Sequence, residues 1–264
     1  MRGMNHTEYG IRDVALRGEI LRTVVGSGVH GIAIAGTDDH DEMGVYIEPP
    51  ANVVGLGGSA QHYVFRTQPE GARSGPGDTD LVSYSLHKYL RLATKGNPTA
   101  LLPLYAPAEA VITVTALGEE LRGLASKVLS RGAVHRFLGY LEAQRQRLLG
   151  HSKGKVPSRP ELVARFGYDV KYASHALRLA YQGLEVARDG RLTLPMPAVE
   201  RERVLAVKRG DVSRLDDVLD EIASVQAQVE DLLATGNTPL PEVPDLDAIS
   251  DWAISAHRRH WGWL

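Results

Sequence analysis

Two aspartates separated by one residue are the first candidates for chemistry. Asp39 and Asp41 flank His40, ahead of an apolar run that ends at Pro49. On a β-strand, alternate side chains point to the same face, so both carboxylates project together while His40 points away. Adjacent carboxylates repel each other unless a cation lies between them, and hard oxygen ligands suit Mg²⁺ or Mn²⁺. The spacing therefore predicts a divalent metal site.

A Gly-Ser pair lies upstream of these acids. Gly26 and Ser27 follow residues 21–25, where a strand or helix is expected to end. A tight turn is expected here, because glycine lets backbone N–H groups approach phosphate oxygens closely. The pair and the two acids together describe a phosphate group held over a metal ion.

Two other loops that bind cations or phosphates are excluded. A calcium-binding EF-hand that starts at Asp38 needs a glycine at its sixth position and a glutamate at its twelfth, where this chain has Met43 and Pro49. A Walker loop needs a Gly-Lys-Ser/Thr sequence, and none follows Gly26.

Three blocks of the sequence resemble those of a known family. Gly26-Ser27 followed by Asp39-x-Asp41 is the pattern of the DNA polymerase beta-like nucleotidyltransferase superfamily, and GSGVHG with DDHDEMGVYIEPP resembles its RNA-ligase-associated, RlaP-like branch. Residues 80–99 resemble the second block of that branch, and residues 167–195 resemble the third. One departure is that Leu102-Pro103-Leu104 stands where the family often has a glutamate.

The resemblance implies a metal-dependent nucleotidyltransferase. Such enzymes move a nucleoside monophosphate from a nucleoside triphosphate such as ATP to an acceptor, release pyrophosphate and use two Mg²⁺ or Mn²⁺ ions. The family places a third acid on a later strand, which we assign to Asp80, with Asp78 as the alternative. Asp39, Asp41 and Asp80 are then the catalytic residues and the metal ligands, and Gly26 and Ser27 hold the pyrophosphate side.

A second group of candidates lies on a helix predicted from Asp169 to Asp189. Lys171, His175 and Arg178 are at positions i, i+4 and i+7, on a face beside the apolar stripe. Because this helix lies in the third block, the resemblance makes Lys171 and Arg178 charge partners of the triphosphate or of the acceptor's phosphate, with His175 as a further candidate. The alternative is a helix face that only contacts water.

The apolar spacing predicts strands in the first half of the chain and helices from residue 116 onward. The resemblance implies the rest of the fold class, which is α+β, with a small mixed nucleotidyltransferase sheet flanked by helices and followed by an all-helical C-terminal domain. We expect a catalytic domain at residues 1–115 and a helical domain at residues 116–264. The expected strands are residues 41–47, 62–67 and 79–84. The expected helices are residues 11–25, 85–94, 134–149, 169–189 and 215–233, with a short helix that a Ser158–Glu161 capping box opens and Gly167 ends.

Bulk properties limit the class of protein. The chain has 264 residues, of which 43% are hydrophobic, so it can bury a core. A net charge of -2 argues against non-specific coating of nucleic acid. The chain has no cysteine, which excludes disulfides and a thiol nucleophile and fits a reducing, cytoplasmic location. We expect no signal peptide and no membrane partner, because no run approaches the ~20 apolar residues of a spanning helix.

Two alternatives would use the same residues. A non-catalytic nucleotide-binding or partner-neutralising module would keep the site without turnover, and a metal-dependent phosphohydrolase would release free phosphate. The sequence leaves open the acceptor, which can be an RNA end, a protein side chain or a small molecule. It also leaves open the preferred triphosphate, the oligomeric state and the role of the stretch from Gly55 to Asp78.

Overall fold

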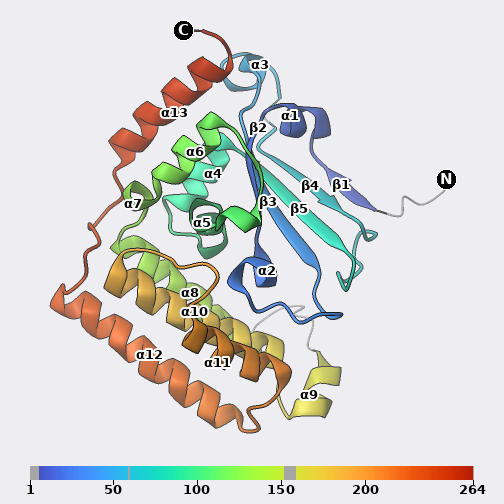
Figure 1. The fold of residues 1–264 in the computed structure, drawn as a ribbon, viewed down its shortest axis with the longest axis vertical. Coiled ribbons are helices and arrows are strands. Elements are labelled where there is room, and N and C mark those ends of the chain that lie inside the picture. The colour runs from blue at the N-terminus through green and yellow to red at the C-terminus, as the bar shows by residue number, and fades with distance from the viewer. Residues whose placement is uncertain (1–5, 59, 152–158, 264) are drawn as a thin grey trace. The chain divides into compact units, whose positions relative to one another are not determined.

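The computed structural model describes residues 6–58, 60–151 and 159–263. The chain divides into two compact units (Figure 1). Met1–Val128 and Pro244–Leu264 form the first, here called the sheet unit, and Leu129–Val243 form the second, here called the helical unit. A domain boundary between residues 115 and 116 stays a prediction, while the compact units divide between residues 128 and 129.

A six-stranded mixed sheet forms the centre of the sheet unit. The strand order is β1-β4-β5-β3-β2-β6, in which β3 and β5 are parallel and the other neighbours are antiparallel. The strands are β1 Thr7–Tyr9, β2 Glu19–Val24, β3 His40–Tyr46, β4 His62–Arg66, β5 Thr79–Ser85 and β6 Val111–Val114. The strands predicted at residues 41–47, 62–67 and 79–84 are therefore confirmed.

Short helices flank this sheet. They are α1 Arg12–Arg17, α2 Gly26–His30, α3 Pro50–Val53, α4 Leu86–Ala93, α5 Pro98–Tyr105, a 3-10 turn at Ala108–Ala110, α6 Ala116–Gly123, α7 Ala125–Val128 and α13 Leu246–His260. Side-chain caps fix four of the starts, those of α4, α5, α6 and α13. Ser85 accepts from the backbone N–H of Lys88 at the start of α4, and Asn97 accepts from those of Thr99 and Ala100 at the start of α5. The buried face of α4 contains Leu86, Tyr89, Leu90 and Ala93, as its spacing predicted.

The helix predicted over residues 11–25 is wrong. The helix α1 ends at Arg17, and β2 occupies the second half of the segment. Gly18 makes the change of direction possible, because a Cβ there would lie 2.2 Å from the Ile47 carbonyl oxygen, and the Ile47 N–H donates to the Gly18 carbonyl. Sheet pairing on both edges of β2 overrides the helical spacing. Gly26 and Ser27 then open the helix α2.

The helix α13 returns from the C-terminal end of the chain to pack in the sheet unit. The carboxylate of Glu120 accepts hydrogen bonds from Arg259 at 2.6 and 2.8 Å and from the Trp252 indole at 2.9 Å. The Arg259 and Trp252 hydrogen bonds hold the pKa of Glu120 at about 2. The Trp261 indole donates to the Glu48 carbonyl at 2.8 Å. These contacts hold α13 against the rest of the sheet unit.

The helical unit is built around one long helix. Its helices are α8 Arg131–Leu148, α9 Pro160–Phe166, α10 Val170–Asp189, α11 Ala198–Arg209 and α12 Leu215–Thr235. The buried helix α10 packs against α8, α11 and α12 (Figure 1). The Asp169 side chain caps its start, and Gly190 ends it in a left-handed conformation. The helices predicted at residues 134–149, 169–189 and 215–233 are confirmed.

The fold class is confirmed as an α+β arrangement with helices flanking a mixed sheet and a largely helical second half. The predicted cap residue Ser158 lies outside the described residues, and α9 starts at Pro160 and ends before Gly167. Among the helices in the described ranges, none is long and apolar enough to cross a membrane.

Candidate active site

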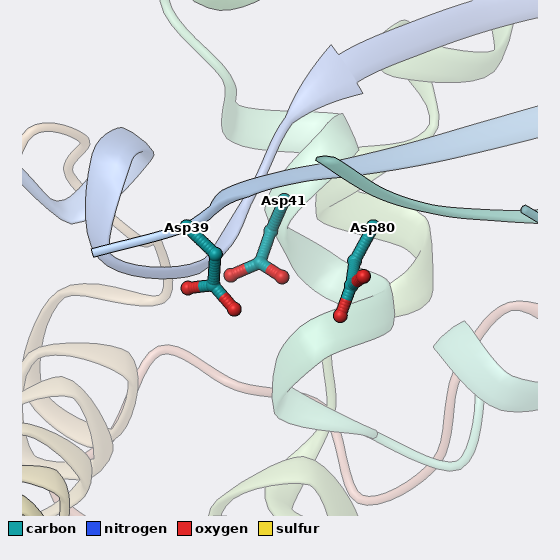
Figure 2. Close-up of side chains that lie close together, drawn as sticks. All are labelled: Asp39, Asp41 and Asp80. Atoms are coloured by element: carbon teal, nitrogen blue, oxygen red, sulfur yellow. The ribbon is translucent and has the colours of Figure 1, made fainter. Parts of the chain in front are cut away.

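Three carboxylates converge on one side of the sheet. Asp41 lies in β3 and Asp80 in β5, and the two residues are register partners across this parallel pair. Asp39 lies two residues before Asp41, so its side chain points to the same face. One carboxylate oxygen from each residue lies within 4.8 Å of the other two. Figure 2 shows all three side chains projecting to the same side of the strands.

Asp80 joins this cluster, whereas Asp78 has a different place. Asp78 accepts a hydrogen bond from the Thr67 hydroxyl at 2.8 Å and one from the Gly75 backbone N–H at 2.9 Å. It therefore holds the turn that leads into β5. His40 pairs with Glu42, at 3.1 Å between Nε2 and Oε1, as expected for a residue that points away from the two acids.

Residues that the sequence did not single out hold Asp80. Gln68 Nε2 donates to its Oδ1 at 2.8 Å, and Ser74 Oγ donates to its Oδ2 at 2.7 Å. Arg66 is the register partner of Asp80 in β4, and its Nε lies 3.8 Å from Asp80 Oδ2. No sequence motif indicates these three residues. Arg66 reaches Asp80 through the pairing of β4 with β5, and Gln68 and Ser74 reach it from the segment that follows β4. The pairing of β4 with β5 would have indicated Arg66.

Gly26 lies against one of the carboxylates. Its φ of +61° is in the left-handed region, and a Cβ at this position would lie 2.0 Å from Asp41 Oδ2. Both features require glycine. The Val25 backbone N–H also donates to the Asp41 carbonyl at 2.9 Å, which joins the start of α2 to β3. Within the described part of the chain, the half-buried Ser27 hydroxyl has no hydrogen-bond partner, so it is available to a ligand.

A cavity of about 340 Å³ contains this part of the site. Asp41 and Asp80 line it together with Gly26 and Arg66, and Asn97 and Thr99 line it from the start of α5. Its volume is in the usual range for a small-molecule site. Carboxylates lie on one side, with a guanidinium and the first residues of a helix also in the wall. The cavity can therefore take a ligand that carries both a cation and phosphate groups.

The carboxylate cluster suits a small divalent cation. Ligand oxygens about 2.1 Å from one Mg²⁺ ion lie about 3.0 Å apart in neighbouring positions and about 4.2 Å apart in opposite positions. The three oxygens, which lie within 4.8 Å of one another, would reach these separations by side-chain rotations that bring them closer together. All three ligands are hard oxygens, which favours Mg²⁺ or Mn²⁺ over softer metals. The three acids therefore fit the metal that the resemblance implies.

The other candidates lie in the helical unit. Lys171, His175 and Arg178 are on α10, and Arg178 donates to Gln182 Oε1 at 3.0 Å. Burial lowers the pKa of Arg178 to about 10. Burial also lowers the pKa of His175, and the positive charges of Arg178, Lys171, Arg147 and Arg159 lower it further. His175 is therefore neutral at pH 7, inside a group of cationic side chains.

Arg159 connects this cationic group to the start of α10. Its Nη1 lies 3.5 Å from Asp169 Oδ2, and its guanidinium lies 5.0 Å from the centre of the Tyr172 ring. The structure thus divides the predicted residues into two groups. Gly26 and Ser27 belong with the acids in the sheet unit, while Lys171, His175 and Arg178 share one helix of the helical unit.

The sequence comparisons identify the family of the chain. Residues 18–245 match the RlaP family, described as the RNA repair pathway DNA polymerase beta family. The chain belongs to this family. The match covers all three resembling blocks, so the resemblance is confirmed, and RlaP membership makes the chain a member of the polymerase beta-like nucleotidyltransferases.

A solved structure also matches this RlaP protein. A nucleotidyltransferase-like protein from Exiguobacterium sibiricum 255-15 is 11% identical, with a TM-score of 0.30, over 94% of this chain and 73% of that one. The similarity is too low to transfer residue roles. None of the curated proteins matches the sequence.

Proposed function

We propose that this protein transfers a nucleoside monophosphate from a nucleoside triphosphate to an acceptor and releases pyrophosphate. The observation that carries the proposal is the register pairing of Asp41 with Asp80, with Asp39 within 4.8 Å and Gly26 against Asp41. RlaP membership supports the same class of chemistry. A cluster of acids beside the glycine at the start of α2 suits a metal-bound triphosphate, because the acids can hold the metal while the backbone at the glycine leaves room for phosphate oxygens.

Asp39, Asp41 and Asp80 would hold the metal and fix its position. When bound, Mg²⁺ or Mn²⁺ supplies positive charge that stabilises the attacking and leaving oxygens of an in-line displacement. An acceptor oxygen forms a bond to the α-phosphorus while the bond from that phosphorus to the bridging oxygen breaks. Pyrophosphate leaves, and the acceptor's proton passes to solvent. Gly26, Ser27 and Arg66 bind the leaving side of the triphosphate.

The cationic group on α10 has a supporting role in this proposal. Lys171 and Arg178 bind phosphate charge of the triphosphate or of the acceptor. Because His175 is neutral, it binds through a hydrogen bond rather than through charge.

An RNA end is the first acceptor to test, because the family is described as one of RNA repair. A protein side chain and a small molecule are the alternatives. A cytoplasmic location, expected from the absence of cysteine, stays a prediction.

The test follows two labels in parallel. Triphosphates labelled at the α- or γ-phosphate are incubated with Mg²⁺ and RNA, with Asp41→Asn as the inactive control. The proposal expects α-label on the acceptor and γ-label in pyrophosphate. Free γ-phosphate without acceptor labelling would indicate a phosphohydrolase, and nucleotide binding without any release of label would indicate a non-catalytic module. Either result would replace the proposal.

A further inference from the structure

The exposed face of α4 carries a line of positive charge. Lys88 and Arg91 lie one helical turn apart, and Lys95 follows shortly after the end of the helix, over a span of about 10 Å. The opposite face of α4 is buried, so these three side chains point outward. None of them forms an ion pair with any residue that the structure describes. The whole chain has a net charge of -2, so this local excess of cations does not reflect a generally basic protein.

This basic line borders the active-site cavity. Leu92 of α4 lines that cavity and also a smaller hollow of about 140 Å³. The other residues of the small hollow are polar or cationic, namely Gln61, His87, Lys88, Arg91 and Lys95. His87 and Arg91 in turn line a third, larger groove. All three hollows belong to the sheet unit, and each shares side chains with the next.

The larger groove has a volume of about 730 Å³ and lies between α3, α4 and α13. Its lining is mainly apolar, and two of its aliphatic side chains are well exposed, with Val54 at 67% and Ile254 at 58%. Trp261 supplies an aromatic ring there, held by its hydrogen bond to the Glu48 carbonyl and by edge contact with His257 at 5.2 Å. Arg258 adds a cation to the same lining.

The acidic residue that lines the groove, Glu48, is buried and accepts a hydrogen bond from the backbone. Glu48 is 5% exposed, and its Oε1 accepts from the Ala60 backbone N–H at 2.8 Å. The accessible charge of the lining is therefore positive. A ligand that matches the three hollows needs negative charges spaced along α4, apolar flat groups for the groove and an end that reaches the carboxylates. A single-stranded polynucleotide has all three properties.

We propose that these connected hollows, here called the furrow, are the binding path of a single-stranded polynucleotide acceptor. Its phosphates lie along Lys88, Arg91 and Lys95, its bases occupy the groove beside Trp261, and its end reaches the cavity at Asp41 and Asp80. The position of that end rests on the proposed function. The binding of the strand along α4 does not, since it follows from charge and shape in the sheet unit. A partner helix would match the apolar groove but not the line of cations that leads to the active site.

The test measures binding without turnover. Fluorescence anisotropy is recorded with labelled single-stranded RNA of about 15 nucleotides, and with DNA of the same sequence, over a range of salt concentrations. The double variant R91Q/K95Q is compared with R12Q/R17Q, which removes two equally exposed arginines from α1 of the same unit. If the furrow binds the strand, R91Q/K95Q should bind at least about tenfold more weakly, because two phosphate contacts are lost. The slope of log affinity against log salt concentration should also be smaller in magnitude by about two. The control variant should bind like the wild type.

A third variant tests the groove. Ile254→Glu places a negative charge on an exposed side chain in the groove, so folding should be retained. It should weaken binding of the strand while the R12Q/R17Q control stays at the wild-type value. A preference for RNA over DNA, or its absence, identifies which polynucleotide the furrow accepts.

Failure of the furrow and failure of the proposed function give different results. Equal binding by R91Q/K95Q and R12Q/R17Q, or no binding of either strand by the wild type, would overturn the furrow even if nucleotide transfer to a short acceptor is found. Strand binding that depends on Arg91 and Lys95 in a protein without transferase activity would support the furrow and reject the proposed function.

Discussion

Asp41 and Asp80 are register partners on the parallel strands β3 and β5, so their carboxylates project at the same level from neighbouring strands. Neighbouring strands are about 4.8 Å apart. Two negative charges at this spacing repel each other, and a bound divalent cation removes that repulsion. Gln68 and Ser74 donate to Asp80 and partly compensate its charge. If this cluster is the metal site proposed above, the metal-free protein carries an electrostatic cost that a bound cation would remove.

We expect Asp41→Asn and Asp39→Ala each to lower transfer at least about 100-fold, because each removes a ligand that positions charge at the reacting phosphate. The metal-free variants should be as stable as the wild type or more stable, since a repulsion is lost. Thermal unfolding with and without Mg²⁺ and triphosphate measures this, and only the wild type should gain stability from the ligands. Asp78→Asn is the control, because Asp78 lies outside the cluster. Full activity of Asp41→Asn would contradict the metal assignment.

Gly26→Ala should damage both the fold and the site. Alanine in the left-handed region costs about 1–2 kcal/mol, and the new Cβ would displace the Asp41 carboxylate, which lies 2.0 Å from that position. Gly36→Ala is a matched control, because Gly36 also has a positive φ of +77° but nothing within 4 Å of its Cβ position. Urea unfolding should show a loss of stability in both variants. Transfer should fall only in Gly26→Ala, and equal activity of the two would remove Gly26 from the site.

Ser74→Ala should raise the Mg²⁺ concentration needed for half-maximal activity, by about tenfold, because residues that orient a metal ligand usually affect metal affinity. The hydroxyl of Ser74 donates to Asp80 Oδ2 at 2.7 Å. Thr67→Ala is the control, since the Thr67 hydroxyl donates to Asp78 at 2.8 Å and reaches Gln68 Oε1 only at 3.4 Å, with no bond to Asp80 itself. A Mg²⁺ titration of activity that is unchanged in Ser74→Ala would show that Asp80 keeps its position without this hydrogen bond.

The sequence predicts which acids of a motif come together in the candidate site, but it does not indicate the residues that reach this site through strand pairing. The spacing of Asp39 and Asp41 was sufficient to predict two carboxylates on one face. The choice between Asp78 and Asp80 needed the register of β5 against β3, which no local pattern contains. Arg66, Gln68 and Ser74 come from a strand end and a loop whose path is set by tertiary contacts.

The predicted elements show the same limit. Helices with a cap and an apolar stripe, such as α10, were located within a residue or two, because local interactions determine their ends. The segment at residues 11–25 was mistaken for one helix, because β2 is paired on both edges and its residues are buried for that reason. Such burial gives no simple alternation.

If Lys171 binds phosphate as proposed, Lys171→Ala should raise the KM for triphosphate more than it lowers kcat, because the lost charge would act in the ground state and the transition state alike. Arg178→Ala should act in the same way, with an added loss of stability because Arg178 donates to Gln182. Arg209→Ala, on the exposed end of α11, is the control. Steady-state kinetics that are unchanged in both variants would reduce α10 to a scaffold.

His175 makes stability depend on pH. Its pKa in the folded protein is well below the usual 6.5, owing first to burial and then to Arg178, Lys171, Arg147 and Arg159. Below pH 6.5 the unfolded state therefore binds a proton that the folded state does not, so the free energy of unfolding falls as the pH decreases. His175→Gln removes this contribution.

Urea unfolding at about pH 7.5 and about pH 5.5 compares the two proteins on either side of the usual histidine pKa. The wild type should lose more stability than His175→Gln between these values, by up to about 1.4 kcal/mol per pH unit below the unfolded pKa. An equal loss in both proteins would show that His175 takes up its proton in the folded state as easily as in the unfolded chain.

Asp245 forms two contacts with Lys127. Its backbone N–H donates to the Lys127 carbonyl at 2.9 Å, and its carboxylate forms an ion pair with Lys127 Nζ at 3.1 Å. The chain thus re-enters the sheet unit beside the point where it left, so the helical unit is an insertion between two adjacent positions. During synthesis, Glu120 is made long before its partners Trp252 and Arg259. All six strands are therefore synthesised before the helical unit, and α13 can pack against them only after the whole helical unit has been synthesised.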